Sequence, residues 1–138
     1  MVNSTQWTVP LRRDSLAATE ADVTGFLSQH GIAGHAAYVT QLVVEEVVRN
    51  LIEHTPPYAH DETATVSITV TARSVTVVIE DDRPPFDPID APPLDVTAPL
   101  EERRAGGMGL HLVRRLTDQL TYERADDRNR LTAVVSRS

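Results

Sequence analysis

Two consecutive segments of the chain alternate strictly between apolar and polar residues, and this pattern limits the possible folds more than any other feature. In TATVSITVTA, residues 63–72, Val66, Ile68 and Val70 share one face, and threonine or serine occupies the other. SVTVVIED, residues 74–81, repeats the pattern after a tight turn. A period of two is typical of strands that are buried on one face. The sequence therefore predicts an antiparallel hairpin whose other face is in water.

Three segments predict helices around this hairpin. Residues 14–31 begin with an N-cap at Asp14 or Ser15 and end at the stop signal Gly31. Residues 34–55 carry apolar side chains at i, i+3, i+4 and i+7 and stop before two prolines. The same periodicity resumes in the segment GGMGLHLVRRLTDQL.

The remaining segments complete the order β-α-α-β-β-loop-α-β-β. A short strand is expected at residues 4–11, and a second hairpin is expected from residues 120–125 and 129–138. Residues 83–105 contain six of the nine prolines and break every pattern, which is typical of a lid, a binding loop or a disordered segment. Segregated hairpins and helices predict one α+β domain over residues 1–138: a two-layer α/β sandwich with helices on one face of a mainly antiparallel mixed sheet.

Composition disfavours several classes of function. The net charge of −7 argues against nucleic acid or an anionic membrane as a direct partner, because both attract basic surfaces. The absence of cysteine excludes disulfides, thiolate metal sites and a cysteine nucleophile. The N-terminus has no signal-like apolar run and no segment reaches membrane-spanning length, so a cytoplasmic protein is expected.

The first candidate site lies in the helical segment VVEEVVRNLIEH. Glu46, Asn50 and His54 recur at i, i+4 and i+8 and therefore form one row along the helix. The row lies about 120° from the centre of the apolar stripe, at the margin of the buried face, while Glu45 and Arg49 belong to the solvated face. A carboxylate and an amide there suit a general base and a metal-oxygen ligand. Taken alone, the segment is explained better as an ordinary amphipathic helix.

Two further candidates follow along the chain. Asp81 continues the buried face of its strand, where an unpaired carboxylate is costly, so its partner is either a ligand amino group or the local backbone amides. The glycines of GGMG, Gly106–Gly109, open the last helix, where free amides and the helix dipole favour a phosphate. Arg103 and Arg104 just upstream offer charged contacts to such a phosphate. A flexible hinge is the alternative use of these glycines.

The order of these features resembles the GHKL, or Bergerat-fold, ATPases, and among them the RsbW-like anti-sigma-factor serine/threonine kinases. EEVVRNLIEH is similar to the N-box, EDDRPPFDP to the G1 box and RRAGGMGLHLVRRLTD to the G2 box of that superfamily. The similarity extends from about Trp7 to Ser136. It implies the Bergerat ATP-binding fold, ATP and Mg²⁺ as cofactors, and an ATP lid at about residues 83–105.

The resemblance also implies roles for individual residues. Asn50 would ligate the Mg²⁺ that bridges the ATP phosphates, and Glu46 would take the proton from the attacking hydroxyl. Asp81 would accept a hydrogen bond from the adenine amino group. Further nucleotide contacts are expected from Arg83, Arg104, Gly107, Met108, Gly109 and Leu110.

Arg83 departs from the family pattern, because the G1 box has a glycine at this position. Glycine lets the backbone pass close to adenine or take a positive φ. An arginine there points to solvent, stacks on the base or fills part of the pocket, and the sequence leaves these three placements open.

The function implied is a kinase that phosphorylates an anti-sigma-factor antagonist and regulates transcription by partner switching. A sigma factor is a second expected partner, and a homodimer is plausible by the same resemblance. The alternative, motivated by Arg83, is a nucleotide-binding or degenerate module that sequesters a protein and has little or no kinase activity. A plain ATP hydrolase is a third, weaker interpretation.

Overall fold

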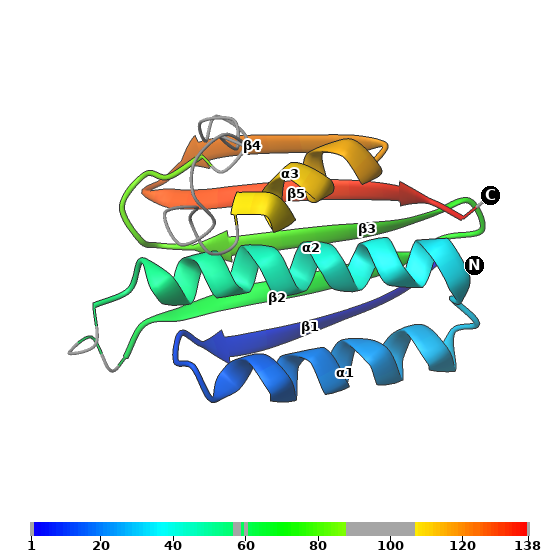
Figure 1. The fold of residues 1–138 in the computed structure, drawn as a ribbon, viewed down its shortest axis with the longest axis horizontal. Helices are drawn as coiled ribbons and strands as arrows, with labels where there is room; N and C mark the ends of the chain where they lie inside the picture. Colours follow the sequence, from blue (N-terminus) through cyan, green and yellow to red (C-terminus); the bar gives the residue numbers. More distant parts are fainter. Residues whose placement is uncertain (1, 57–58, 60, 88–106, 138) are drawn as a thin grey trace.

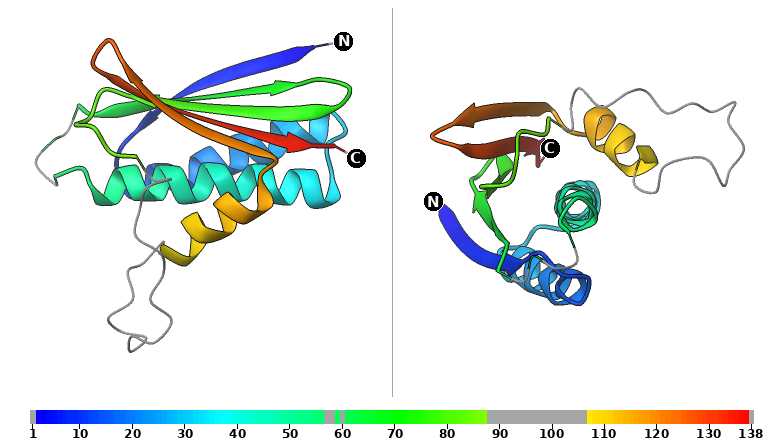
Figure 2. Two further views of the ribbon diagram at one scale, coloured as in Figure 1. Left: turned by 90° about the horizontal axis from the view of Figure 1, so that it is seen from above. Right: turned by 90° about the vertical axis from the view of Figure 1, so that its left-hand side faces the viewer.

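The computed structural model describes residues 2–56, 59, 61–87 and 107–137. Five strands form one sheet, and three helices cover one of its faces (Figures 1 and 2), which confirms the predicted two-layer α+β architecture. None of these helices has both the length and the apolarity needed to cross a membrane. Of the predicted lid, residues 88–105 lie outside the described residues. The elements are β1 (Asn3–Pro10), α1 (Ser15–Gln29), α2 (Gly34–Glu53), β2 (Thr63–Val70), β3 (Ser74–Asp81), α3 (Gly107–Leu116), β4 (Gln119–Ala125) and β5 (Arg128–Ser136).

The sheet joins strands that are distant in sequence. Its order is β1-β2-β3-β5-β4. All four pairings are antiparallel, so the described sheet is antiparallel throughout rather than mixed. β3 pairs along its whole length with β5, and this register places Asp81 directly opposite Asn129.

Local backbone chemistry explains the chain reversals. α1 ends before Gly31, whose φ of +71° is a left-handed conformation that glycine adopts without the penalty of a Cβ. The predicted cap Asp14 precedes α1, although its side chain makes no capping hydrogen bond. The β4–β5 hairpin turns through Asp126 and Asp127, where φ is 55° and 59°, as in a type I′ turn. The stop signal at Gly31 and the hairpin turn lie where the sequence predicts them.

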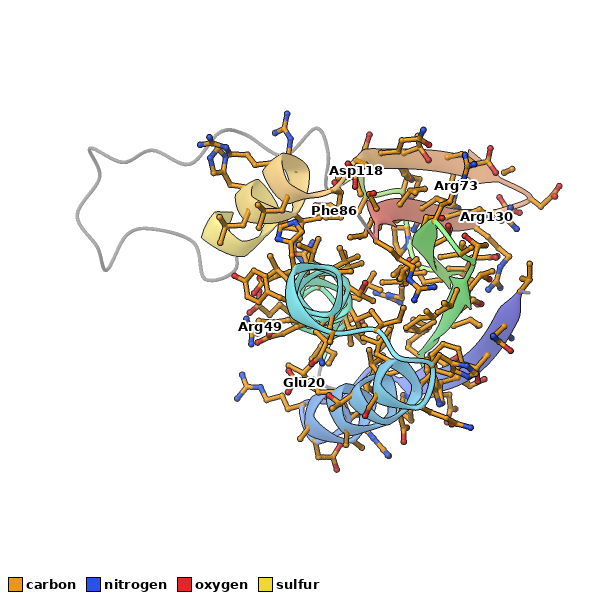
Figure 3. The ribbon with its side chains drawn as sticks, turned by 90° about the vertical axis from the view of Figure 1, so that its right-hand side faces the viewer. Glu20, Arg49, Arg73, Phe86, Asp118 and Arg130 are labelled. Carbon is orange, nitrogen blue, oxygen red and sulfur yellow. The ribbon has the colours of Figure 1, made fainter. Side chains whose placement is uncertain are left out.

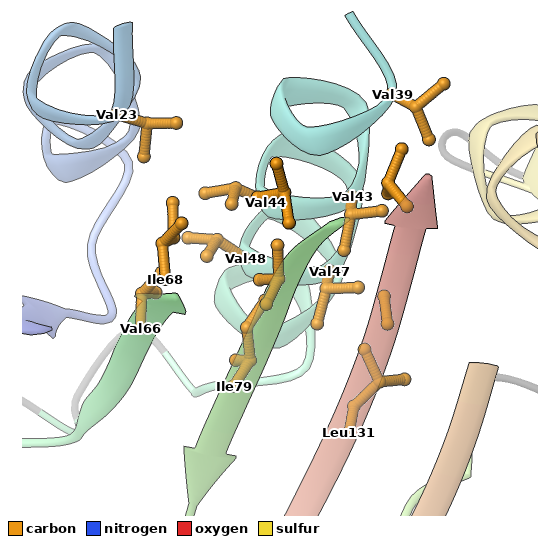
Figure 4. Packing of buried hydrophobic residues seen from close by; sticks show 14 of the residues in the cluster. Val23, Val39, Val43, Val44, Val47, Val48, Val66, Ile68, Ile79 and Leu131 are labelled. Carbon is orange, nitrogen blue, oxygen red and sulfur yellow. The ribbon is translucent and has the colours of Figure 1, made fainter. Parts of the chain in front are cut away.

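The apolar core lies between the helices and the sheet. Figure 4 shows Val48 of α2 over Ile68 and Ile79 of the sheet, and each of the three is at most 2% exposed. Two carboxylates interrupt these apolar surfaces. The inward face of β3 ends on Asp81, which is 4% exposed, and the buried side of α2 includes Glu46, which is 7% exposed.

α2 occupies the centre of the helical layer. It contacts α1 on one side and α3 on the other, and it also packs against β3 and β5 (Figure 2). A side chain on its α3 flank is therefore enclosed by the start of α3 as well as by its own helix.

Candidate functional site

Asp81 occupies the predicted place, at the inward end of β3. Its Oδ1 accepts hydrogen bonds from Asn129 Nδ2 and from the backbone N–H of Arg83, both at 2.9 Å. Among the described residues, Oδ2 receives no hydrogen bond from the chain. The local partners that the sequence allowed are therefore observed at Oδ1, while a ligand amino group as donor to Asp81 stays a prediction.

Asn129 organises this end of the sheet, although no pattern in the sequence identified it as a site residue. The residue is 5% exposed. Besides Asp81, its Nδ2 donates to the carbonyl oxygens of Arg83 and Pro84, each at 3.1 Å, and its Oδ1 accepts from the Tyr122 hydroxyl at 2.5 Å. Asn129 thus holds both the Asp81 carboxylate and the backbone that follows β3. Only the β3–β5 register could have identified it.

The side chain of Arg83 is held by an ion pair with Glu62, with Nη1 3.3 Å from Oε1, and remains 20% exposed. Its backbone is ordinary, since the described non-glycine residues with positive φ are Asp126 and Asp127. The conformational freedom of glycine is therefore not required here. The structure directs the arginine toward Glu62, just before β2, a contact that was not among the three placements left open by the sequence.

Two adjoining cavities lie beside Asp81 and Asn50. A cavity of about 20 Å³ includes Asp81 in its lining and has room for one water molecule. A second, of about 190 Å³, is lined by Asn50, His54, Arg83 and Phe86, among others. This volume is below the roughly 300–1,000 Å³ of drug-sized ligand sites, so it suits one heterocyclic ring system rather than a whole nucleotide.

One wall of the larger cavity is aromatic. The Phe86 ring lies 4.8 Å from the His54 imidazole, centroid to centroid, at an interplanar angle of 33°. Phe86 belongs to the PPFDP segment, and His54 ends the row predicted on α2. A flat apolar wall of this kind suits the face of an aromatic ligand.

Glu46 is the second buried carboxylate and lies on the α3 flank of α2. Its Oε1 accepts a hydrogen bond from Arg49 Nη1 at 3.0 Å, whereas its buried Oε2 has no partner among the described residues. A Cβ on Gly109 would overlap the Glu46 carboxyl group, so the backbone at the start of α3 packs directly on it. A buried acceptor without a donor is unfavourable, so its presence calls for an explanation, of which a catalytic role is one.

Burial raises the pKa of the Glu46 carboxyl above its ordinary value. The Arg49 guanidinium opposes this shift, while the carboxylates of Glu45 and Glu53 add to it. Desolvation is the largest effect, because it disfavours the charged form. A raised pKa brings a carboxylate closer to the basicity that proton abstraction near neutral pH requires.

The structure brings the predicted residues together in two groups. Asp81 and Asn50 line one cavity, and Arg83 lines its neighbour. Glu46 meets Gly109, and Leu110 packs against the core. Gly107 and Met108 begin α3. The Met108 side chain lies outside the described part of the structure, as do Arg103, Arg104 and Gly106.

Comparisons with known proteins identify the family of the chain. Residues 9–135 match the model of the histidine kinase-like ATPase domain. The serine/threonine-protein kinase BtrW of Bordetella bronchiseptica is 28% identical over 95 residues, which cover 69% of this chain and 67% of BtrW.

A solved structure has the same fold. The RsbU and RsbW domains of Rv1364c from Mycobacterium tuberculosis superimpose with a TM-score of 0.67 at 13% identity, over 98% of this chain and 32% of that one. The present chain thus spans about a third of that protein's solved length. Because the family model matches nearly the whole sequence, the resemblance is confirmed, and the chain belongs to the histidine kinase-like ATPase family.

Proposed function

We propose that this protein is an ATP-dependent serine/threonine kinase whose substrate is an anti-sigma-factor antagonist. The observation that carries the proposal is Glu46, a buried carboxylate with one tethered oxygen and one oxygen that has no partner in the described part of the chain. Similarity to BtrW, a serine/threonine-protein kinase, supports the reaction class. The antagonist, a sigma factor as second binding partner, a homodimeric state and a cytoplasmic location follow from the family resemblance.

The proposed reaction uses Glu46 as general base. The oxygen of a serine or threonine hydroxyl forms a bond to the γ-phosphorus of ATP, and the hydroxyl proton passes to Glu46 Oε2. The bond between the γ-phosphorus and the bridging oxygen breaks, and its electron pair leaves with ADP. Phosphoryl transfer depends chiefly on positioning and charge neutralisation, so few protein groups are needed.

The described residues fit a nucleotide and one metal ion. The Asp81 carboxylate, held by Asn129, would accept a hydrogen bond from the adenine amino group. Asn50 would hold Mg²⁺, which neutralises phosphate charge when it is bound. Within the described part of the chain no cluster of three or more His, Cys, Asp or Glu could hold a metal by itself. This agrees with Mg²⁺, which binds through few protein oxygens together with substrate phosphates.

The close fit at Gly109 supports the proposed phosphate cradle. A Cβ at this position would overlap Glu46, so the glycine lets α3 begin directly against the proposed base. Backbone amides at a helix start favour an anion. The proposal therefore places the γ-phosphate at the start of α3, beside Glu46 rather than between the two.

A second candidate function is a protein-sequestering module with little or no phosphotransfer. Arg83 favours it, because this residue lines the larger cavity and its side chain is tied to Glu62. A nucleotide base would then compete with an arginine that already has a partner. The two candidates differ in turnover and in their sensitivity to residue 83.

The test combines binding with phosphotransfer. A fluorescent ATP analogue is titrated against wild type, Asp81→Asn and Arg83→Gly with Mg²⁺ present. Phosphate transfer to the cognate antagonist is measured for wild type, Glu46→Gln and the control Glu123→Gln, whose side chain on β4 is 64% exposed. The kinase proposal expects wild-type binding that Asp81→Asn weakens, and transfer that only Glu46→Gln abolishes. Nucleotide binding without any wild-type transfer would leave the sequestering module as the function. Tight binding that is equal in wild type and Arg83→Gly would remove the reason to prefer that module.

A further inference from the structure

We propose that Arg49 is the positioning residue of the Glu46 carboxylate: it holds Oε1 and so leaves Oε2 as the oxygen that receives the proton. This inference rests on the proposed role of Glu46 as the base. Arg49 itself touches neither the cavities beside Asp81 nor Gly109 in the described contacts. Its action is therefore on Glu46 and not on the reacting groups.

The guanidinium of Arg49 bridges two carboxylates of its own helix. Nη1 lies 3.0 Å from Glu46 Oε1, and Nη2 lies 2.5 Å from Glu45 Oε1. The side chains of Arg49 and Glu45 are 36% and 35% exposed, while that of Glu46 is 8% exposed. Figure 3 shows Arg49 on the side of α2 that faces away from the sheet. The bridge thus connects the solvent side of α2 to the buried base.

The planar guanidinium explains how this bridge fixes direction. Its N–H groups form a rigid fork, so anchoring one arm on Glu45 determines where the other arm points. That other arm meets Glu46 Oε1, and the backbone of α3 at Gly109 bounds the carboxyl group on the opposite side. A long glutamate side chain between these two contacts has little rotational freedom left. Its Oε2 consequently keeps one orientation before any substrate arrives.

The bridge also acts on the charge of Glu46. Among the described residues, Arg49 is the cation that lowers the Glu46 pKa against burial, and Glu45 and Glu53 on the same helix raise it. On α3, the first described titratable side chain beyond the contact at Gly109 is His111, which is exposed. Losing the guanidinium should therefore both loosen the carboxylate and favour its protonated form.

Arg49→Gln and Arg49→Lys separate these two effects. Glutamine removes the charge and the fork, whereas lysine keeps the charge and removes the fork. Arg73→Gln and Arg73→Lys are the matched controls, because Arg73 lies in the exposed turn between β2 and β3, and Figure 3 shows it on the sheet, well away from Arg49. Glu45→Gln is a further variant that releases only the outer arm of the bridge.

The measurements are kcat, KM and the pH profile of phosphotransfer, nucleotide affinity, and the titration of Glu46 by carboxyl ¹³C NMR in nucleotide-free protein, assigned with Glu46→Gln. Arg49→Gln should lower kcat by roughly 10- to 100-fold, because a misplaced general base loses most of its contribution, with nucleotide affinity unchanged within about twofold. In this variant, the acidic limb of the pH profile of phosphotransfer and the NMR titration of Glu46 should both move to higher pH. Arg49→Lys should bring the Glu46 titration closer to that of wild type than it brings kcat. Glu45→Gln should lower kcat by less than Arg49→Gln does.

Wild-type kcat and a wild-type Glu46 titration in both Arg49 variants would overturn the inference, as would equal losses in the Arg73 controls. If Arg49→Gln fails to fold, Arg49→Lys and Glu45→Gln decide by the same readouts. Failure of the proposed function is recognised separately. The NMR titration needs neither nucleotide nor substrate, so a protein that transfers no phosphate still reports whether Arg49 controls Glu46.

Discussion

Gly109 lies in α3 with an ordinary negative φ, and the Glu46 side chain is the neighbour that a larger residue would meet. Gly109→Ala therefore sets two effects against each other. Alanine is favoured over glycine in a helix by about 0.5–1 kcal/mol. Forcing an extra methyl group into occupied space costs about 1–3 kcal/mol. The variant should be less stable than wild type by about 0–2.5 kcal/mol, because Glu46 is held by Arg49 and cannot simply swing away.

A double-mutant cycle isolates the overlap. In a Glu46→Ala background the space is empty, and Gly109→Ala should then stabilise the protein by about 0.5–1 kcal/mol. The coupling energy between the two positions should be about 1–3 kcal/mol. Gly25→Ala is the control, since no atom lies within 4 Å of the point that its Cβ would occupy, so it should be stabilising in either background.

Urea unfolding followed by circular dichroism measures the free energy of unfolding of wild type, of the two single variants and of the double variant. Thermal melts should agree, at about 3–5 °C per kcal/mol for a chain of this size. If Gly109→Ala stabilised the wild-type background as much as Gly25→Ala does, Glu46 would not occupy the space next to α3. The proposed contact between the base and the phosphate cradle would then be wrong.

Four further variants test the site and the core by the same unfolding measurement. Asn129→Ala leaves the buried Asp81 carboxylate without its side-chain donor and should cost about 1–3 kcal/mol, while Tyr122→Phe, which removes one hydrogen bond, should cost about 0.5–1.5 kcal/mol. Ile68→Ala, at a position that is 0% exposed, should cost about 2–5 kcal/mol. The raised pKa of Glu46 means that the folded state binds the proton more tightly, so its contribution to wild-type stability is full below the ordinary pKa of 4.5 and is lost as pH rises through the folded pKa. Glu46→Gln should abolish that decline, and an unchanged pH dependence of stability would contradict the assigned shift.

The sequence predicted those parts of the fold that depend on local patterns. Strict alternation located β2 and β3, and the inward position of Asp81 followed from it. Helical spacing placed Glu46 and Asn50 at the margin of the buried face, where the structure has them buried and half-buried. Each of these inferences needs only neighbours within a few residues.

What the sequence could not supply depends on contacts between distant segments. Asn129 becomes a partner of Asp81 only through the pairing of β5 with β3, and no local pattern specifies that register. Arg49 was assigned to the solvated face by its angle on the helix, yet its long side chain reaches back to Glu46. The direction of the Arg83 side chain could not be predicted either, because its partner Glu62 lies just before β2 and is distant in sequence. A helical wheel gives the direction of a Cβ atom. The roles of Arg49 and Arg83 depend instead on the position of the guanidinium group at the end of a long, flexible side chain.

The pairing of β3 with β5 also affects the order in which the protein can be completed on the ribosome. The ribosome synthesises the chain from the N-terminus, so β3 is complete before β5 exists. While residues 82–127 emerge, β3 is an open edge whose N–H and C=O groups lack a strand partner, and such edges invite wrong pairing. During the same interval, Asp81 lacks the hydrogen bond that Asn129 donates in the complete protein. The pairing of β5 with β3 therefore closes the sheet and brings Asp81 and Asn129 together in one step. A compact precursor without β5 would have the Asp81 carboxylate but not its side-chain donor.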